Sequence, residues 1–487
     1  MIGRGRPGPD LFQRGLAAVV PPWMDRNLRL LLATRMAMSV GRSVLSIVTA
    51  LYLAALGFSG LEIGTLFVGV TFASALMSSA VGLLSDRVGR KPFLVVVPIL
   101  AAGASVAYAT TTAAVVLFVA AALGSFGRGA GAGGGNVGPY QPAESAFIAE
   151  DVPAGHRVEA FGRVAFTSVL GGLVGGLMAQ LVDAGPHTTA AAALGAYRPA
   201  FLASAVLFLL AGVVALGLRE PAAHGRRQTN RAVRPSRWPR RSWPALWRLW
   251  ITNGTNGVAM GLFAPFMSYW MYRRYGVGAG QIGILFVLVN IGSLSATVMA
   301  PAISGRFGTV RAIIAVRMLG GLLILPMVLA PTFWAAGAAY FLRMLAQRVG
   351  MPLRLSFVQD MAHPSERATV AALSTVPAQV TMAGGQTLAG YLFDEVSLSA
   401  PFEIAALFQC VDAALYAILF ALSPPQPSAA ETAGAPGALP AADPDGAGGK
   451  PETGKGTDPD PGQAGADPVG GHAGVDPVGG QAVREPR

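Results

Sequence analysis

The sequence is poor in charge, and this limits the class of protein that it can encode. Only 13% of the 487 residues are Asp, Glu, Lys or Arg, whereas an average soluble domain has about a quarter. Apolar residues make up 53% of the chain, and the mean hydropathy is +0.51. A water-soluble fold of this size cannot bury so much apolar surface. The composition therefore excludes a soluble enzyme and predicts a chain surrounded by lipid.

Cysteine and histidine are also scarce. The single Cys410 excludes an intramolecular disulfide framework and any zinc or iron–sulfur site built on several cysteines. No G-x-x-x-x-G-K-[ST] loop is present to hold nucleotide phosphates. We expect no metal, no cofactor and no catalytic residue. The five histidines lie in predicted loops or in the tail, without metal-ligand spacing: His156, His187, His224, His363 and His472.

In place of charge, the chain has long uncharged runs. A membrane-spanning helix needs about 20 largely apolar residues, and the runs predict twelve such helices. The first is too long and too far from the N-terminus for a signal peptide. The predicted spans are about 30–55, 63–85, two within 92–127 divided at 109–112, 164–182, 199–218, 249–272, 275–305, two within 310–353 divided at Pro331-Thr332, 368–393 and about 403–422.

The two halves of the chain repeat. Residues 60–90 align with residues 279–309 without a gap, and ten of the 31 positions are identical. Further on, residues 142–157 match residues 352–367 at a shift nine residues smaller. Because six helices per half is an even number, both halves enter the membrane in the same sense, as in the parallel repeats of secondary transporters. We therefore expect an all-α membrane protein of two six-helix bundles, related by a pseudo-two-fold axis along the membrane normal.

Charge in the loops and composition at the ends define the remaining organisation. Arg and Lys concentrate in the even-numbered loops and the central linker, which predicts a multi-pass protein of the cytoplasmic membrane with both termini in the cytoplasm. The bases form no continuous groove, so we expect no nucleic-acid partner. The tail is rich in Pro, Gly, Ala and Asp, and is predicted to be disordered. The expected parts are an N-terminal segment (1–27), two bundles (28–218 and 245–423), a basic linker (219–244) and the tail (424–487).

One loop carries a family signature. Gly82-Leu-Leu-Ser-Asp-Arg-Val-Gly-Arg-Lys91 resembles the signature loop of the major facilitator superfamily, G-x-L-[SA]-D-R-x-G-R-[RK], at every specified position. Together with the twelve helices, the duplication and the basic linker, this resemblance covers about residues 28–422. It implies a secondary transporter that works by alternating access and is not an enzyme.

The resemblance also implies a conformational gate on this loop. Gly82 and Gly89 allow the tight turn, and Asp86 is expected to accept hydrogen bonds from the N-terminus of the eleventh helix when the cytoplasmic side is closed. The basic residues of the loop have a second interpretation, which is positive-inside topology alone. The relay that the resemblance implies joins Arg87 and Arg90 to Glu150 or Asp151 and to Arg157.

Polar residues within the predicted spans are candidates for the substrate site. The resemblance places helices 1, 4, 7 and 10 around a central cavity, and guanidinium groups there suit anionic or polyhydroxylated substrates. The alternative is that Arg35 and Arg348 reach the surface and that other arginines cap backbone carbonyls. Arg42 lies near mid-helix and is the strongest single candidate. The expected cavity residues are Arg35, Arg42, Arg128, Asn253, Asn256, Tyr269, Asn290, Arg343, Gln347 and Gln379.

Two acids are candidates for proton coupling. Asp412 is the deepest acid, in the twelfth helix, and Glu144 follows a glycine-rich stretch in the fourth. Desolvation favours the protonated form of such a carboxyl. Each acid has an alternative role: Asp412 in an internal ion pair with Arg317, and Glu144 as an inner-surface residue. The glycine-rich stretch, residues 127–135, is either a loose insertion or a broken helix that lines a cavity.

These observations predict proton-coupled efflux of a small drug, metabolite or organic anion. Residues 171–176 (Gly-Gly-Leu-Val-Gly-Gly) partly match an antiporter motif of the family and favour export slightly. An importer of a sugar or organic anion is the alternative. A polytopic membrane enzyme and a transport-dead sensor are more distant ones. The expected partners are a small-molecule substrate, protons and the lipid bilayer, and we expect a monomer.

Overall fold

The computed structural model describes residues 21, 23–126, 138–182, 190–220, 241–363 and 366–421, and every structural statement below concerns these residues. All of them lie in one compact unit, Met1–Gln426. They are helical, and no strand occurs among them. The predicted tail and the glycine-rich stretch lie outside the described residues.

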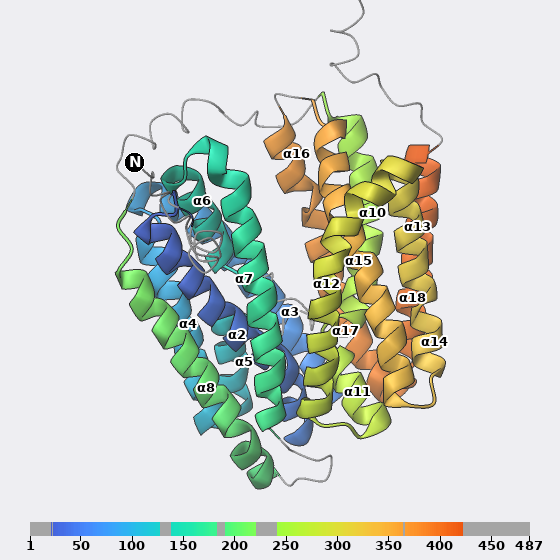
Figure 1. Ribbon diagram of the computed structural model, residues 1–487. Coiled ribbons are helices and arrows are strands. Elements are labelled where there is room, and N and C mark those ends of the chain that lie inside the picture. The colour runs from blue at the N-terminus through green and yellow to red at the C-terminus, as the bar shows by residue number, and fades with distance from the viewer. Residues whose placement is uncertain are drawn as a thin grey trace, which may run out of the picture. The chain divides into compact units, whose positions relative to one another are not determined.

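The first half makes six spans, coloured blue to green in Figure 1. One span is divided between α5 and α6, on either side of the glycine-rich stretch. Pro139 directly precedes α6, and its fixed φ angle suits the start of a helix. The helices are α2 (Arg26–Ala55), α3 (Gly60–Val88), α4 (Lys91–Thr110), α5 (Ala114–Gly124), α6 (Tyr140–Asp151), α7 (Arg157–Met178) and α8 (Ala190–Leu216).

The second half also makes six spans, and three of them are interrupted. Each interruption lies within three residues of a proline: Pro265, Pro326 or Pro377. Proline lacks the backbone N–H that a continuing helix needs and restricts the residue before it. The helices are α10 (Trp243–Phe263), α11 (Met267–Tyr275), α12 (Ala279–Phe307), α13 (Thr309–Leu322), α14 (Ile324–Leu329), α15 (Phe333–Met361), α16 (Arg367–Ser374), α17 (Val376–Glu395) and α18 (Ala400–Tyr416).

The sequence located most spans but not all of their breaks. The breaks between α4 and α5 and before α15 fall where polar turns were expected. Residues 249–272, 310–330 and 368–393 were each expected as one helix. These three expectations are wrong, since the ranges contain the breaks at residues 264–266, at Leu323 and at Thr375.

Eight helices of the described chain are long and apolar enough to cross a membrane. The spans that do not meet this description are the divided α5–α6 and the more polar α10, α15 and α17. Three of these four are the spans expected to line the cavity (the fourth, seventh and tenth). The lower hydropathy of α10 and α15 is consistent with helices that face a polar interior rather than lipid, whereas α5 is apolar and is excluded by its length alone.

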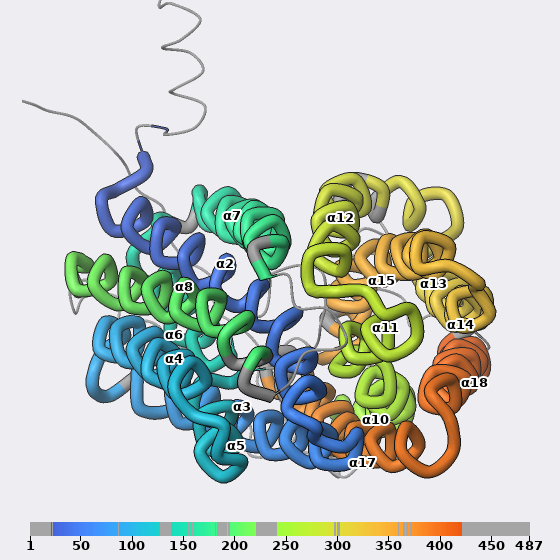
Figure 2. The backbone as a smooth tube through the Cα atoms, turned by 90° about the horizontal axis from the view of Figure 1, so that it is seen from below, coloured from blue at the N-terminus to red at the C-terminus, as the bar shows by residue number. Residues whose placement is uncertain are grey.

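Helices from opposite halves pack in two pairs. The tube view in Figure 2 shows α7 beside α2 and α12, and α17 beside α3 and α10. Each of α7 and α17 thus contacts one helix of its own half and one of the other half. We call α3–α17 and α7–α12 the two seams.

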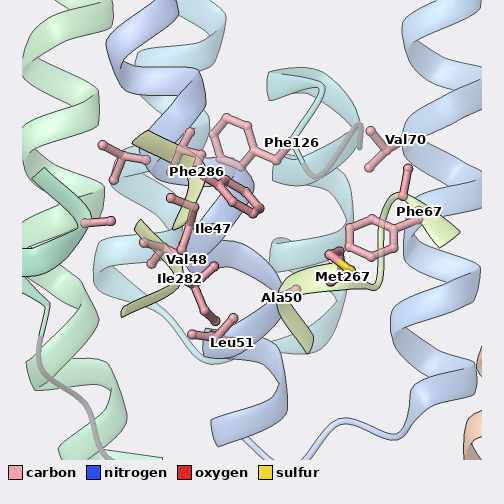
Figure 3. Close-up of a cluster of buried hydrophobic side chains, with 14 of the residues drawn as sticks. Ile47, Val48, Ala50, Leu51, Phe67, Val70, Phe126, Met267, Ile282 and Phe286 are labelled. Carbon is pink, nitrogen blue, oxygen red and sulfur yellow. The ribbon is translucent and has the colours of Figure 1, made fainter. Parts of the chain in front are cut away.

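The apolar core joins the halves at one end only. We name the ends by residues: α3 runs from the Asp394 end, at Gly60, to the Arg90 end, at Val88. In Figure 3, side chains of α2 meet Met267, Ile282 and Phe286 of the second half. This shared cluster takes second-half members from residues 262–289, 324–344 and 389–406, which are the parts of those helices near the Asp394 end. The buried apolar residues nearer the Arg90 end of the second half form a separate cluster.

Candidate functional site

The signature loop is held to the first half by Arg90. Gly89 has φ +113°, a conformation that favours glycine, and ends α3. The Arg90 side chain donates from Nη1 to Ser85 Oγ at 2.5 Å and pairs through Nη2 with Glu150 Oε1 at 3.0 Å. Arg87 is exposed, and the Asp86 side chain lies outside the described residues. Gly82 lies within α3 and not in the turn, and apart from its chain neighbours and its own helix backbone no described atom lies within 4 Å of a methyl group placed there.

Other polar contacts brace the same end. The Arg90 and Lys91 amides donate to the two carboxylate oxygens of Glu220, at 2.6 and 3.1 Å, so that the acid caps α4. Asp151, expected to join the arginine relay, instead accepts from Asn27 Nδ2 at 2.9 Å. Arg157 donates from Nε to the Val152 carbonyl at 3.1 Å. Of the expected relay contacts, the structure contains the Arg90–Glu150 pair, whereas Asp151 and Arg157 contact other partners.

An acid at the opposite end joins the two halves. Asp394, in the last turn of α17, accepts from the Gly60 amide at 2.8 Å and from the Leu61 amide at 2.7 Å. These are the first two residues of α3, whose N-terminus favours a negative charge. Sequence reasoning missed Asp394 because its partners lie 333 and 334 residues away.

Small residues allow the seams to close tightly near Asp394. A methyl group at Gly64 would lie 2.6 Å from the Gln386 carbonyl oxygen of α17, and one at Gly176 would lie 3.0 Å from the Gly283 carbonyl oxygen of α12. Gln386 also accepts from Thr71 Oγ1 at 3.1 Å across the α3–α17 seam. Neither seam could retain this spacing with larger side chains at the glycines.

The Gly-Gly-x-x-Gly-Gly motif of α7 packs on two sides. Gly171 and Gly175 face α2, where a methyl group at Gly175 would lie 2.6 Å from the Val40 carbonyl oxygen. Gly172 and Gly176 face α12. Residues four apart lie on one helix face, so each pair of glycines brings a different neighbour close.

Arg35 and Glu144, two candidates of the first half, form one buried ion pair. Arg35 Nη1 lies 2.6 Å from Glu144 Oε2, and the two side chains are 4% and 3% exposed. Arg35 Nε also donates to Ser168 Oγ at 2.7 Å. The alternative that Arg35 reaches the surface is therefore wrong. Glu144 Oε1 is buried with no hydrogen-bond partner among the described residues.

Arg42 lies at the divided fourth span. Its Nη1 donates to the Ser125 carbonyl at 2.9 Å and its Nη2 to the Gly124 carbonyl at 3.2 Å, so it caps the C-terminus of α5. A methyl group at Gly138, on the far side of the break, would lie 3.5 Å from both Nη atoms. The strongest single substrate candidate of the sequence thus caps the end of α5 and lies close to Gly138, two residues before α6. Arg128 lies outside the described residues.

Asp412 belongs to a polar cluster away from the seams. It accepts from Arg317 Nη1, as the internal-pair alternative predicted, and Arg317 lies 4.5 Å above the Tyr416 ring. Gln409 Nε2 lies 3.4 Å from Asn256 Oδ1 and 3.5 Å from Asp412 Oδ2. Asn256 therefore points to α18 and this cluster.

Arg343 differs from the other buried arginines. It is 2% exposed, and its guanidinium carbon lies 3.6 Å from the centre of the Phe263 ring. Nη1 lies 4.0 Å from Met344 Sδ, and Nε has no hydrogen-bond partner in the described part of the chain. One turn later, Gln347 is exposed and donates to Met260 Sδ at 3.4 Å.

The remaining predicted cavity residues lie in different environments. Asn253 Nδ2 donates to the Ser374 carbonyl at 2.7 Å, at the α16–α17 break. Asn290 donates to the Phe286 carbonyl at 2.9 Å, and Gly172 closely approaches its side chain at the α7–α12 seam. Two further candidates have contrasting exposure: Tyr269 is buried and Gln379 is exposed.

Comparison with known proteins adds a family to this geometry. The model of a family described as the Major Facilitator Superfamily matches residues 31–254 and again residues 249–468. The multidrug resistance protein MdtG of Dickeya zeae (strain Ech586) is 25% identical over 307 residues, which cover 60% of this chain and 69% of that protein. The uncharacterized MFS-type transporter YceJ of Bacillus subtilis (strain 168) is 25% identical over 135 residues. That match spans only 27% of this chain and 34% of YceJ.

Solved transporter structures share the fold. A bacterial homologue of the human lysosomal transporter Spinster, in an inward-facing and occupied conformation, aligns with a TM-score of 0.63 and 13% identity over 82% of this chain and 97% of that chain. The nucleoside transporter NupG aligns with a TM-score of 0.64 and 15% identity over 82% of this chain and 100% of its own. At such identities the likeness establishes the fold alone.

Proposed function

Because this chain belongs to the Major Facilitator Superfamily, we propose that it exports a small organic solute across the cytoplasmic membrane in exchange for protons. The observation that carries this proposal is the asymmetry between the two ends. At the Asp394 end the halves share an apolar core, two close seams and a cross-half helix cap. Toward the Arg90 end, the second half has an apolar cluster of its own.

We place the Arg90 end in the cytoplasm. Arg87, Arg90 and Lys91 lie there, together with the start of the basic linker, and positive charge is enriched on the cytoplasmic side of membrane proteins. In this orientation the halves share an apolar core on the outer side and have separate apolar clusters toward the cytoplasm, so a central site would be accessible from the cytoplasm. Transport then requires the seams to open near Asp394 while the halves close near Arg90.

Two observations support export over import. The relative MdtG is named a multidrug resistance protein. In addition, residues 171–176 of α7 partly match an antiporter motif of the family, and Gly172 and Gly176 of this motif approach α12 closely. The motif therefore lies on a surface that must separate during the transport cycle.

We assign proton coupling to the Arg35–Glu144 pair. A proton on Glu144 would cancel the charge that holds Arg35, and the free oxygen Oε1 offers a place for it. The pair joins α2 to α6, so its protonation bears directly on the divided fourth span. Asp412 is less suited to this role, although its Oδ1 also has no partner among the described residues, because its pair with Arg317 joins α13 to α18, away from the seams and from the divided fourth span.

Transport in proteoliposomes tests the proposal. The purified full chain is reconstituted with a pH-sensitive dye inside, and a panel of organic anions, sugars and cationic drugs is applied in turn. We expect at least one solute to move in the direction opposite to protons. Movement of solute and protons in the same direction would instead establish an importer.

The coupling residue is tested with Glu144→Gln, which keeps the shape of the side chain but cannot carry the charge. We expect this variant to lose proton-driven accumulation while it retains solute exchange at equal concentrations. Asp412→Asn is the matched control and should retain proton-driven transport in properly folded protein. Coupled transport at the parent rate in Glu144→Gln would refute the assignment.

A further inference from the structure

One buried cation in the second half has no anion. Arg343 is 2% exposed, and no Asp or Glu of the described chain forms an ion pair with it. Within the described chain, the one hydrogen-bond contact of its N–H groups is a distant thioether, Met344 Sδ, and Nε has none. An uncompensated charge in a protein interior is costly, so a position of this kind calls for a source of negative charge.

The chain satisfies its other deeply placed guanidinium groups with oxygen. Arg35 has Glu144, Arg317 has Asp412, and Arg42 has the carbonyls at the end of α5. These partners come from neighbouring helices of the same half. Of these four arginines, Arg343 alone has no oxygen partner among the described residues.

The surroundings of Arg343 restrict what could supply the charge. The guanidinium is stacked on Phe263, whose ring centre lies 6.2 Å from that of Tyr340. The Tyr340 ring in turn lies 6.0 Å from Phe286. Stacking occupies the face of the guanidinium and leaves its in-plane N–H donors for a forked contact with two oxygens. Gln347, one turn along α15, places an amide donor on the same helix face.

We propose that Arg343 binds the acidic group of an organic monoanion, a carboxylate or sulfonate, whose apolar body packs against Phe263 and Tyr340. A single unpaired positive charge matches a single negative charge, and the aromatic rings favour an aromatic or aliphatic body over a sugar. The assignment depends on the proposed transport function in one respect, that the bound anion is the transported solute.

A binding measurement tests the site without transport. Purified full-length protein in detergent and chloride-free buffer is titrated with benzoate and benzenesulfonate, and with benzyl alcohol and benzylammonium as neutral and cationic counterparts. We expect benzoate and benzenesulfonate to raise the thermal unfolding temperature and to give measurable heats of binding. Neither counterpart should match them, because neither supplies the missing charge.

Two substitutions at Arg343 test its role in anion binding. Arg343→Met should weaken benzoate binding about 10- to 100-fold, the value of a charged hydrogen bond, and should leave any weak benzyl alcohol binding unchanged. Arg343→Lys keeps the charge but lacks the two parallel N–H donors of the guanidinium group. Its loss of binding affinity should therefore be smaller than that of Arg343→Met, and should be greater for benzoate than for chloride. Arg311→Met removes a charge from an exposed position of α13 and should bind as the parent does.

Several outcomes would overturn the site. They are equal benzoate affinity in the parent and in a folded Arg343→Met, no response to either anion in the parent, or saturation by chloride and sulfate with no preference for benzoate. Size-exclusion profiles establish folding for each variant. Binding that survives in detergent while no solute moves in proteoliposomes would refute the transport proposal and retain the anion site.

Discussion

The deeply placed arginines of the two halves have different kinds of partner. In the first half, Arg35 has a carboxylate and Arg42 has two backbone carbonyls. In the second half, Arg317 has a carboxylate, but Arg343 has an aromatic face and a thioether. A buried charge in a membrane protein can therefore serve structure or be left for a ligand. The partners around it distinguish these roles, whereas burial alone does not.

Breaking the Arg35–Glu144 pair should have the largest effect on stability. Glu144→Leu leaves Arg35 buried without its carboxylate, and loss of one partner of a buried pair costs about 3–5 kcal/mol. We expect a marked fall in the thermal unfolding temperature in detergent. The double variant Arg35→Met/Glu144→Leu should recover much of the loss. A single variant as stable as the parent would show that the pair contributes nothing.

Removal of Arg42 should have the next largest effect. Arg42→Met leaves the Gly124 and Ser125 carbonyls without their donor, at a cost of about 1–3 kcal/mol for unsatisfied buried groups. Thermal unfolding measures the loss, and hydrogen exchange should locate it at the end of α5. Unchanged exchange there would contradict the capping role.

The Asp394 cap should influence conformation more than stability. Asp394→Ala removes the acceptor for the Gly60 and Leu61 amides, and loss of a helix cap costs about 0.5–2 kcal/mol. Because the cap joins the halves, its loss should shift the population toward the state that is open near Asp394. Distances between spin labels on α3 and α17 report this shift, and Glu403→Ala, at the start of α18, is a control that should leave them unchanged.

Of the four substitutions, Arg343→Met should change the free energy of unfolding least, or should increase it. Because no oxygen partner is lost, replacement of the charge by an apolar side chain of similar length is expected to be neutral or stabilising in the absence of ligand. The same arginine-to-methionine change at Arg42 is destabilising, so the two variants measured together test the comparison directly. A loss at Arg343 as large as that at Arg42 would remove the distinction between them.

Local sequence patterns predicted much of the fold. The uncharged runs located the spans, and Ala109–Thr112 and Pro331 located two breaks, because helix length and helix interruption depend on neighbouring residues. The breaks at residues 264–266, at Leu323 and at Thr375 were missed although Pro265, Pro326 and Pro377 lie within three residues of them. Proline in a long apolar run is also compatible with a continuous, kinked helix, so its presence does not decide the matter.

The candidate site was predicted by residue type but not by role. Arg35 and Glu144 were both selected, yet nothing in their spacing of 109 residues indicated that they pair. For Arg317 and Asp412, in contrast, the pair itself was suggested, because both charged residues lie deep within predicted membrane spans. Arg42 was selected as a substrate residue because it lies too deep to reach the surface, and the structure gives that same depth a capping role.

By itself the sequence determined that this chain lies in lipid, that it consists of twelve helical spans and that its halves repeat. These properties depend on composition and on short-range order along the chain. Only the tertiary structure decided which buried charges are neutralised and at which end the halves meet. Charge pairing depends on distances between side chains of different helices, and those distances exist only once the helices have packed.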